Sequence, residues 1–172
     1  MKNLSFLLIS VLIISCGTIV NYDYDQETDF SQYKSYNFFH DIDSGLSEFD
    51  NKRIIYVTDS LLQSRGFVKS ENPNFLINFF AKEFISESNS SIGIGVGGGG
   101  SSGSIGVSGG IPIGGRKINQ LLTIDFIDTS KDILFWQAVS DAEFKEKTTP
   151  TQKEAYYIKL IGKILKGYPP KK

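Results

Sequence analysis

Hydrophobic and polar residues alternate along five segments of the chain, which is the pattern of a half-buried β-strand. The predicted strands are 18–25, 34–40, 74–84, 118–128 and 133–142. In the third strand, Phe75, Ile77 and Phe79 share one face, while Leu76 and Phe80 make part of the other face apolar too. Strands covered on both faces have this composition, so we expect 74–84 to be central in the sheet.

Two further segments have hydrophobic residues at helical spacing. The first is 49–65, and Gly66 is placed to cap its C-terminus. The second begins after Thr149, which is the expected N-cap, with Pro150 at the first helical position and Gln152 completing a capping box. The predicted buried stripes are Ile54, Val57, Leu61 and Leu62 in the first helix, and Tyr157, Ile158, Ile161, Ile164 and Leu165 in the second.

The order of these elements predicts an α+β fold, a mainly antiparallel five-stranded sheet with two helices packed on one face. The last two strands, joined by a polar turn at 128–132, form the clearest hairpin. In that hairpin Leu122, Ile124 and Phe126 share a face, and Leu134, Trp136 and Ala138 are in register with one another.

A glycine- and serine-rich insertion occupies 86–115, with isolated isoleucine and valine residues. Glycine disfavours ordered structure through its backbone entropy, yet 92–96 alternates with a period of two. Two interpretations follow. The segment is either a flexible insertion between strands or a glycine-rich hairpin that becomes ordered against a partner or a membrane.

The chain begins with the features of a bacterial lipoprotein signal peptide. Lys2 gives a positive start, and the apolar run 4–14 has the length of a secretory signal and is too short to span a membrane. The sequence 13–17, Ile-Ile-Ser-Cys-Gly, has the form of a lipobox, whose cysteine receives diacylglycerol before acylation of the new amine. We predict a signal peptide at 1–15, lipidation of Cys16 and one domain over 16–172. The alternative is an ordinary signal peptide or a buried cysteine.

Composition and charge exclude several further classes of function. Without the signal peptide, 157 residues remain with 17 basic and 19 acidic side chains, which suits one domain and lacks the basic stripe that nucleic acids require. Cys16 is the only cysteine, so a disulfide or a cysteine-based site in the folded domain is excluded. Because Gly17 is not the aspartate that retains some lipoproteins in the inner membrane, we expect an outer-membrane anchor facing the periplasm.

Three segments of the mature chain resemble the bacterial lipoprotein family called domain of unknown function 4136. They are 29–36 (Asp-Phe-Ser-Gln-Tyr-Lys-Ser-Tyr), 65–67 with 72–77, and the predicted hairpin at 122–138. Where the family more often has aspartate, this chain has Asn74, and its insertion lacks the aromatic residues that the family often carries there. The resemblance implies an envelope location and a fold, but no reaction.

Few residues have the spacing of a catalytic or metal site. His40, Asp41 and Asp43 are metal-ligating types, but a second histidine is missing and the spacing does not match a calcium loop, so we predict no metal and no other cofactor. Asp125 and Asp128 are the candidate carboxylate pair for acid–base chemistry, with exposure on a strand and its turn as the alternative.

Trp136, Tyr22 and Tyr24 are the candidate ligand-facing residues, together with Tyr36, because such a set of aromatic side chains can line a sugar-binding surface. The alternative is that they belong to the core or to a sheet face, which is the more common role of such residues. The glycines at 97–100 are not followed by the lysine and the helix that a phosphate-binding loop needs.

Three functions are compatible with these observations. The first is a non-enzymatic, lipid-anchored module that binds or scaffolds another envelope component, either a protein or a glycan. The second is a hydrolase of an envelope polymer or lipid, which requires close carboxylates with perturbed pKa values in a concave site. The third is an assembly factor whose segment 92–113 forms hairpins that pair between copies or contact a membrane.

Overall fold

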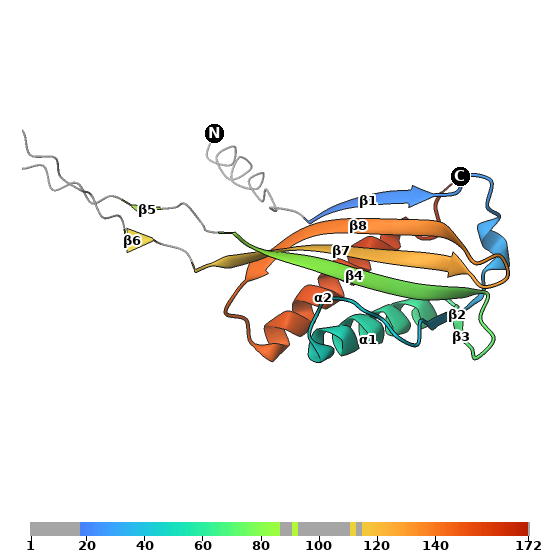
Figure 1. Ribbon diagram of the computed structural model, residues 1–172, viewed down its shortest axis with the longest axis horizontal. Helices are drawn as coiled ribbons and strands as arrows, with labels where there is room; N and C mark the ends of the chain where they lie inside the picture. Colours follow the sequence, from blue (N-terminus) through green and yellow to red (C-terminus); the bar gives the residue numbers. More distant parts are fainter. Residues whose placement is uncertain (1–17, 87–90, 93–110, 113–114, 172) are drawn as a thin grey trace, which may run out of the picture.

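The computed structural model describes residues 18–86, 91–92, 111–112 and 115–171. Within this part of the chain, six strands form one open sheet in the order β1-β8-β7-β4-β2-β3 (Figure 1). The strands are β1 (Ile19–Tyr24), β2 (Ser35–Phe38), β3 (Val68–Lys69), β4 (Phe75–Ser86), β7 (Lys117–Asp128) and β8 (Ile133–Lys145). A separate ribbon pairs β5 (Ser91–Ile92) with β6 (Ile111–Pro112).

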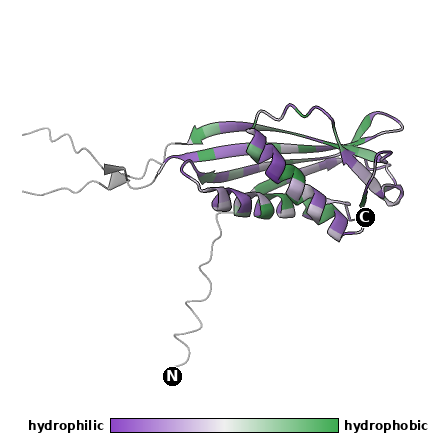
Figure 2. Cartoon of the chain, turned by 90° about the horizontal axis from the view of Figure 1, so that it is seen from below, coloured by the Kyte–Doolittle hydropathy of each residue, from purple (hydrophilic) through white to green (hydrophobic). Residues whose placement is uncertain are grey.

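Two helices, α1 (Glu48–Ser64) and α2 (Pro150–Ile164), lie over the same face of the sheet (Figures 1 and 2). Short 3-10 turns, η2 (Phe30–Gln32) and η3 (Leu165–Gly167), complete the fold. Ser47 caps α1, and the predicted capping box of Thr149 and Gln152 opens α2. Gly66 has a φ of +88°, the left-handed conformation expected of the residue that follows a helix.

The α+β class and the two helices are confirmed, but the prediction of five strands was wrong. The sixth strand, β3, contains only two residues and pairs parallel with β2, which also pairs parallel with β4. A two-residue strand is too short to show an alternation of hydrophobic and polar residues, so the sequence does not predict it. It exists here because Val68 donates its backbone N–H to the carbonyl of Lys34 over a distance of 2.9 Å.

The hydrophobic core lies between the helices and the covered face of the sheet. Phe75, Ile77 and Phe79 are buried there, and β4 lies between β7 and β2, as expected of a central strand. The expectation that both faces of β4 are covered was wrong, because Phe80 on the other face is 39% exposed. The second face of the sheet is therefore open.

Two of the predicted side-chain faces need correction. A β-bulge between Phe126 and Ile127 shifts the register of β8, so that Phe135 and Trp136 are both buried while Leu134 is exposed. In α2, Ile158 is exposed, and Leu160 takes its place in the buried stripe.

The predicted signal peptide at 1–15, Cys16 and most of the insertion at 86–115 lie outside the described residues. Among the helices that are described, none combines the length and the apolar character needed to cross a membrane.

Candidate binding site

The open face of the sheet carries apolar side chains from three adjacent strands. We define it by Leu76, Phe80 and Phe84 of β4, Leu121 and Ile127 of β7, and Leu134 and Val139 of β8. Strand pairing places these side chains in rows that cross the sheet, such as Leu76, Ile127 and Leu134. Phe80, Phe84 and Leu134 are the most exposed large members, at 39%, 53% and 49%.

A polar row lies between the apolar rows of the open face. It contains Asn78, Asp125, Gln137 and Asp23, one from each of four adjacent strands. The amide of Gln137 donates to Asp125 Oδ1 at 2.8 Å. Burial raises the pKa of the Asp125 carboxyl, and this hydrogen bond opposes the rise. The open face thus offers apolar contact and directional hydrogen bonding side by side.

A pocket of about 460 Å³ lies at the end of β8. It exists because β1 begins at Ile19, opposite Asp141, whereas β8 continues to Lys145. Beyond Asp141, the described part of the chain provides no strand on that side of β8. The pocket has an apolar floor of Ala142, Phe144, Tyr156 and Leu160, and it is also lined by the exposed lysines Lys145 and Lys159.

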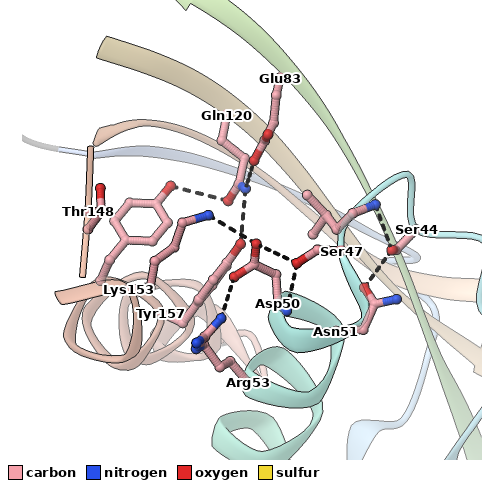
Figure 3. A network of polar contacts seen from close by, with 12 residues as sticks. Ser44, Ser47, Asp50, Asn51, Arg53, Glu83, Gln120, Thr148, Lys153 and Tyr157 are labelled. Atoms are coloured by element: carbon pink, nitrogen blue, oxygen red, sulfur yellow. Dashed lines mark hydrogen bonds and ion pairs between the residues drawn. The ribbon is translucent and has the colours of Figure 1, made fainter. Parts of the chain in front are cut away.

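A network of polar contacts joins the N-terminal ends of the two helices (Figure 3). Asp50, which is buried, accepts hydrogen bonds from Ser47 Oγ at 3.0 Å, Arg53 at 2.8 Å and Lys153 Nζ at 3.0 Å. Lys153 also lies 4.4 Å from the centre of the Phe144 ring. The carboxylate is satisfied by two cations and a hydroxyl, so the network serves to fasten α1 to α2.

Gln120 links the second helix to the sheet within the same region (Figure 3). Its buried amide nitrogen donates to Glu83 Oε1 at 2.7 Å and to the Tyr157 hydroxyl at 3.2 Å, and its oxygen accepts from the Tyr156 hydroxyl at 3.2 Å. Burial raises the pKa of both tyrosine hydroxyls well above the ordinary value. Both therefore stay protonated at neutral pH and act as hydrogen-bonding groups.

The structure separates the three aromatic residues that were candidates for facing a ligand. Trp136 has no exposed surface, and its indole N–H donates to the carbonyl of Gly167 at 3.3 Å. A surface ligand cannot reach it, so the ligand-facing interpretation of Trp136 is wrong and its role is in the core. Tyr22 and Tyr24 are partly exposed on the helix side of β1, where the Tyr22 hydroxyl donates to the carbonyl of Lys163 at 2.9 Å. Tyr36 is buried.

The candidate carboxylates do not converge. Asp125 belongs to the open face, whereas Asp128 lies three residues further along β7 on the covered face and is buried. Asp128 accepts hydrogen bonds from the Tyr33 hydroxyl at 2.6 Å and from the Ser130 backbone N–H at 2.7 Å. Burial favours a higher pKa for Asp128, but the hydrogen bonds outweigh it and lower the pKa to about 2. The two candidate carboxylates therefore do not form an acid–base pair.

The candidate metal-ligating residues lie in an exposed loop. His40 Nδ1 is 2.9 Å from Asp41 Oδ1, and both side chains are almost fully exposed. The hydrogen bond with Asp41, followed by its charge, raises the pKa of His40. Asp43 is also exposed. Among the described residues, no group of three or more histidine, cysteine, aspartate or glutamate side chains could hold a metal ion.

Comparison with protein families defines the class of this protein. The family model described as domain of unknown function (DUF4136) matches residues 20–170. The chain therefore belongs to this family, which confirms the resemblance. No curated protein matches the chain.

Solved structures with the same fold include two different proteins. One is a PDZ domain protein from Parabacteroides distasonis ATCC 8503, with a TM-score of 0.54 and 15% identity over 90% of this chain; the match spans only 37% of that protein. The other is the PelC dodecamer from Paraburkholderia phytofirmans, with a TM-score of 0.51 and 14% identity, covering 87% of this chain and 96% of PelC. A PelC point variant, also a dodecamer, aligns with the same TM-score. At these identities the likeness concerns the fold.

Neither the open apolar face of the sheet nor the pocket at the end of β8 was predicted from the sequence. The partly apolar second face of β4 was visible in Leu76 and Phe80, but it was interpreted as a second buried face. The pocket depends on where β1 stops pairing with β8, and this depends on the register between strands more than 100 residues apart. A single chain gives no direct indication of such a register.

Proposed function

We propose that this protein is a non-enzymatic module of the cell envelope, anchored by lipid on Cys16 in the outer membrane and facing the periplasm. It binds another envelope component through the open face of its sheet. The observation that carries the proposal is the one-sided cover of the sheet, which leaves Phe80 and Phe84 of β4 and Leu134 of β8 exposed, with the partly buried apolar side chains of β7 between them.

The open face is suited to binding a protein. Full burial of a leucine or phenylalanine side chain contributes roughly 1.5–3 kcal/mol, so covering Phe80 and Leu134, which are 39% and 49% exposed, contributes about 1 kcal/mol apiece. The polar row of Asn78, Asp125 and Gln137 supplies hydrogen bonds that select among partners. An exposed apolar patch framed by polar residues is typical of an interaction surface.

The anchor is supported by the sequence next to the first strand. The lipobox ends at Cys16 and Gly17, and β1 begins at Ile19. A tether this short keeps the start of β1 within about 10 Å of the lipid attachment point, since each extended residue spans about 3.3–3.6 Å.

The test is photo-crosslinking in intact cells. p-Benzoylphenylalanine is placed at position 80 or 134 on the open face, and at position 49 or 56 on the exposed side of α1 as matched controls. We expect the same adduct from 80 and 134 and none from the controls, although Phe49 and Tyr56 are even more exposed. Equal adducts from all four positions, or none from the open face, would refute binding through this surface.

The lipid anchor is tested separately. The mass of the mature chain should show diacylglycerol and an acyl group on residue 16, and Cys16→Ser should abolish this modification. An unmodified mature chain of wild-type sequence would contradict the anchor.

A second candidate function is assembly with other copies of this chain. It is favoured by the fold shared with PelC, whose solved structures are dodecamers, and by the edge of β8 at 142–145, with which no strand of the described residues pairs on that side. p-Benzoylphenylalanine at position 143 of this edge separates the two functions, because self-assembly through the edge gives an adduct of twice the mass of the chain at this position.

A further inference from the structure

The end of the sheet nearest the predicted anchor combines exposed apolar side chains with a lysine-lined pocket. We define this anchor end by Ile19, Phe84, Ile85, Lys145 and Lys159. Strand pairing holds the sheet residues close together, since Phe84 lies opposite Asn119, which lies opposite Glu143, and Ile19 lies opposite Asp141. Figure 1 shows the ends of β4 and β8 and the starts of β1 and β7 meeting on one side of the molecule.

Three large apolar side chains at the anchor end are more than half exposed. Ile19 is 61% exposed, Phe84 53% and Ile85 57%. Phe84 and Ile85 are consecutive and point to opposite faces of β4, so the helices cannot cover both. Side chains of this kind favour the boundary between lipid headgroups and acyl chains.

The charges in the pocket suit an anion. Lys117 Nζ lies 3.0 Å from Glu143 Oε2, so these two charges are paired. The remaining charged residues of the lining are Lys145, Lys159 and Asp141, which gives the pocket a net charge of +1 in a chain whose net charge is −1. Lys145 and Lys159 have no ion-pair partner among the described residues.

An unpaired acceptor lies in the same lining. The side-chain oxygen of Asn119 is buried and has no hydrogen-bond partner among the described residues. A buried acceptor without a donor is unfavourable, so a ligand hydroxyl that donates to it gains a favourable contact. An anion that also carries hydroxyl groups therefore suits both the two lysines and the unpaired oxygen of Asn119.

The position of the pocket relative to the lipobox identifies the source of such a ligand. Thr18 and Ile19 line the pocket, and Cys16 precedes Thr18 by two residues. Two residues reach at most about 7 Å, so lipid attached at Cys16 brings the pocket to the headgroup layer whatever path the chain takes.

We propose that the anchor end is a membrane-contact surface, in which the pocket binds the glycerophosphate headgroup of an anionic phospholipid from the leaflet that holds the anchor. Lys145 and Lys159 bind the phosphate, Asn119 accepts a hydrogen bond from a glycerol hydroxyl, and Ile19, Phe84 and Ile85 contact the acyl boundary. The inference rests on the proposed lipidation of Cys16. It adds a fixed orientation, with the anchor end against the membrane.

The test uses the acylated full chain in vesicles of phosphatidylcholine with or without phosphatidylglycerol. Acetylation rates of individual lysines are measured by mass spectrometry. We expect Lys145 and Lys159 each to react about fivefold more slowly with phosphatidylglycerol present, because attraction to the anionic surface favours the bound state of each lysine roughly fivefold. Lys131, in the turn between β7 and β8 at the other end of the sheet, is the matched control and should not change.

A second measurement examines the apolar contacts without altering charge. p-Benzoylphenylalanine at position 84 should form lipid adducts in the same vesicles, whereas at position 134 it should form none. Equal reactivity of all three lysines in both lipids, together with no lipid adduct at 84, would overturn the inference. If that happens while residue 16 is acylated, the anchor stands and only the membrane-contact surface is refuted; a chain without acylation refutes the anchor itself.

Discussion

Asp128 ends β7 and holds the turn that leads into β8. Its Oδ1 accepts hydrogen bonds from the Ser130 hydroxyl at 2.6 Å and from the backbone N–H groups of Ser130 at 2.7 Å and Lys131 at 3.0 Å. Its Oδ2 accepts from the Tyr33 hydroxyl at 2.6 Å, which connects the turn to a segment 95 residues away. Asp128→Asn removes the charge and replaces one of the two acceptor oxygens with a donor.

The magnitude follows from the pKa of this carboxyl. An unfolded aspartate has a pKa of about 3.9, and hydrogen bonding lowers that of Asp128 to about 2 in the folded chain. The difference corresponds to at most about 2.6 kcal/mol of stability at neutral pH. Asparagine keeps one acceptor oxygen and so part of the hydrogen bonding, and we therefore expect Asp128→Asn to lower the free energy of unfolding by about 1–2 kcal/mol. Because the folded pKa is the lower one, the stabilisation is present above about pH 4 and is lost as the pH falls through about 2.

The assay is denaturant unfolding followed by circular dichroism between pH 7 and pH 2. The wild-type chain should lose stability more steeply with acid than Asp128→Asn, and the two curves should converge near pH 2. Asp43→Asn, in an exposed loop, is the control and should leave the curve unchanged. Parallel curves for wild type and Asp128→Asn between pH 5 and pH 2 would show that these hydrogen bonds do not set the pKa.

Two further predictions concern packing and buried polar contacts, and both are checked by chemical unfolding. Gly167→Ala should destabilise the chain by about 1–3 kcal/mol, because its Cβ would overlap the ring of Tyr22; Gly162→Ala, with nothing within 4 Å of the new Cβ, should instead stabilise α2 by up to about 1 kcal/mol. Equal effects of the two changes would contradict the close contact. Gln120→Leu should cost about 2 kcal/mol or more, because it leaves the buried hydroxyls of Tyr156 and Tyr157 without their amide partner; a loss below about 0.5 kcal/mol would show that they find other partners.

The sequence correctly predicted those features of the fold that depend on residues close together in the chain, such as strand alternation and helix capping. The alternation in 118–128 places Leu122, Ile124 and Phe126 in the core because successive side chains of a strand point to opposite faces. The capping box of Thr149 and Gln152 satisfies backbone N–H groups within four residues, so it can be recognised without tertiary contacts.

The remaining features depend on partners that are distant in sequence. Leu134 was predicted to share a face with Trp136 and Ala138 because an ideal alternation requires it, but the bulge adds Phe135 to the covered face and turns Leu134 outward. The ion pair of Lys153 with Asp50 joins residues 103 positions apart. Neither residue has a spacing that would suggest the other, so the fastening of α1 to α2 could not be predicted.

Partner binding by the open face and membrane contact by the anchor end together predict how the domain is oriented on the membrane. β4 contains 12 residues and at about 3.3 Å per residue spans roughly 40 Å, from Ser86 at the anchor end to Phe75 near the β7–β8 turn. If the anchor end rests on the membrane, Phe84 lies in the headgroup layer, whereas Leu134 faces the periplasm well above it. A crosslinker moved along the open face should therefore capture lipid at 84 and another envelope component at 134, with position 80 between the two. If the order is reversed, with lipid captured at 134 and not at 84, the domain is anchored in the opposite orientation and Cys16 cannot be its point of attachment.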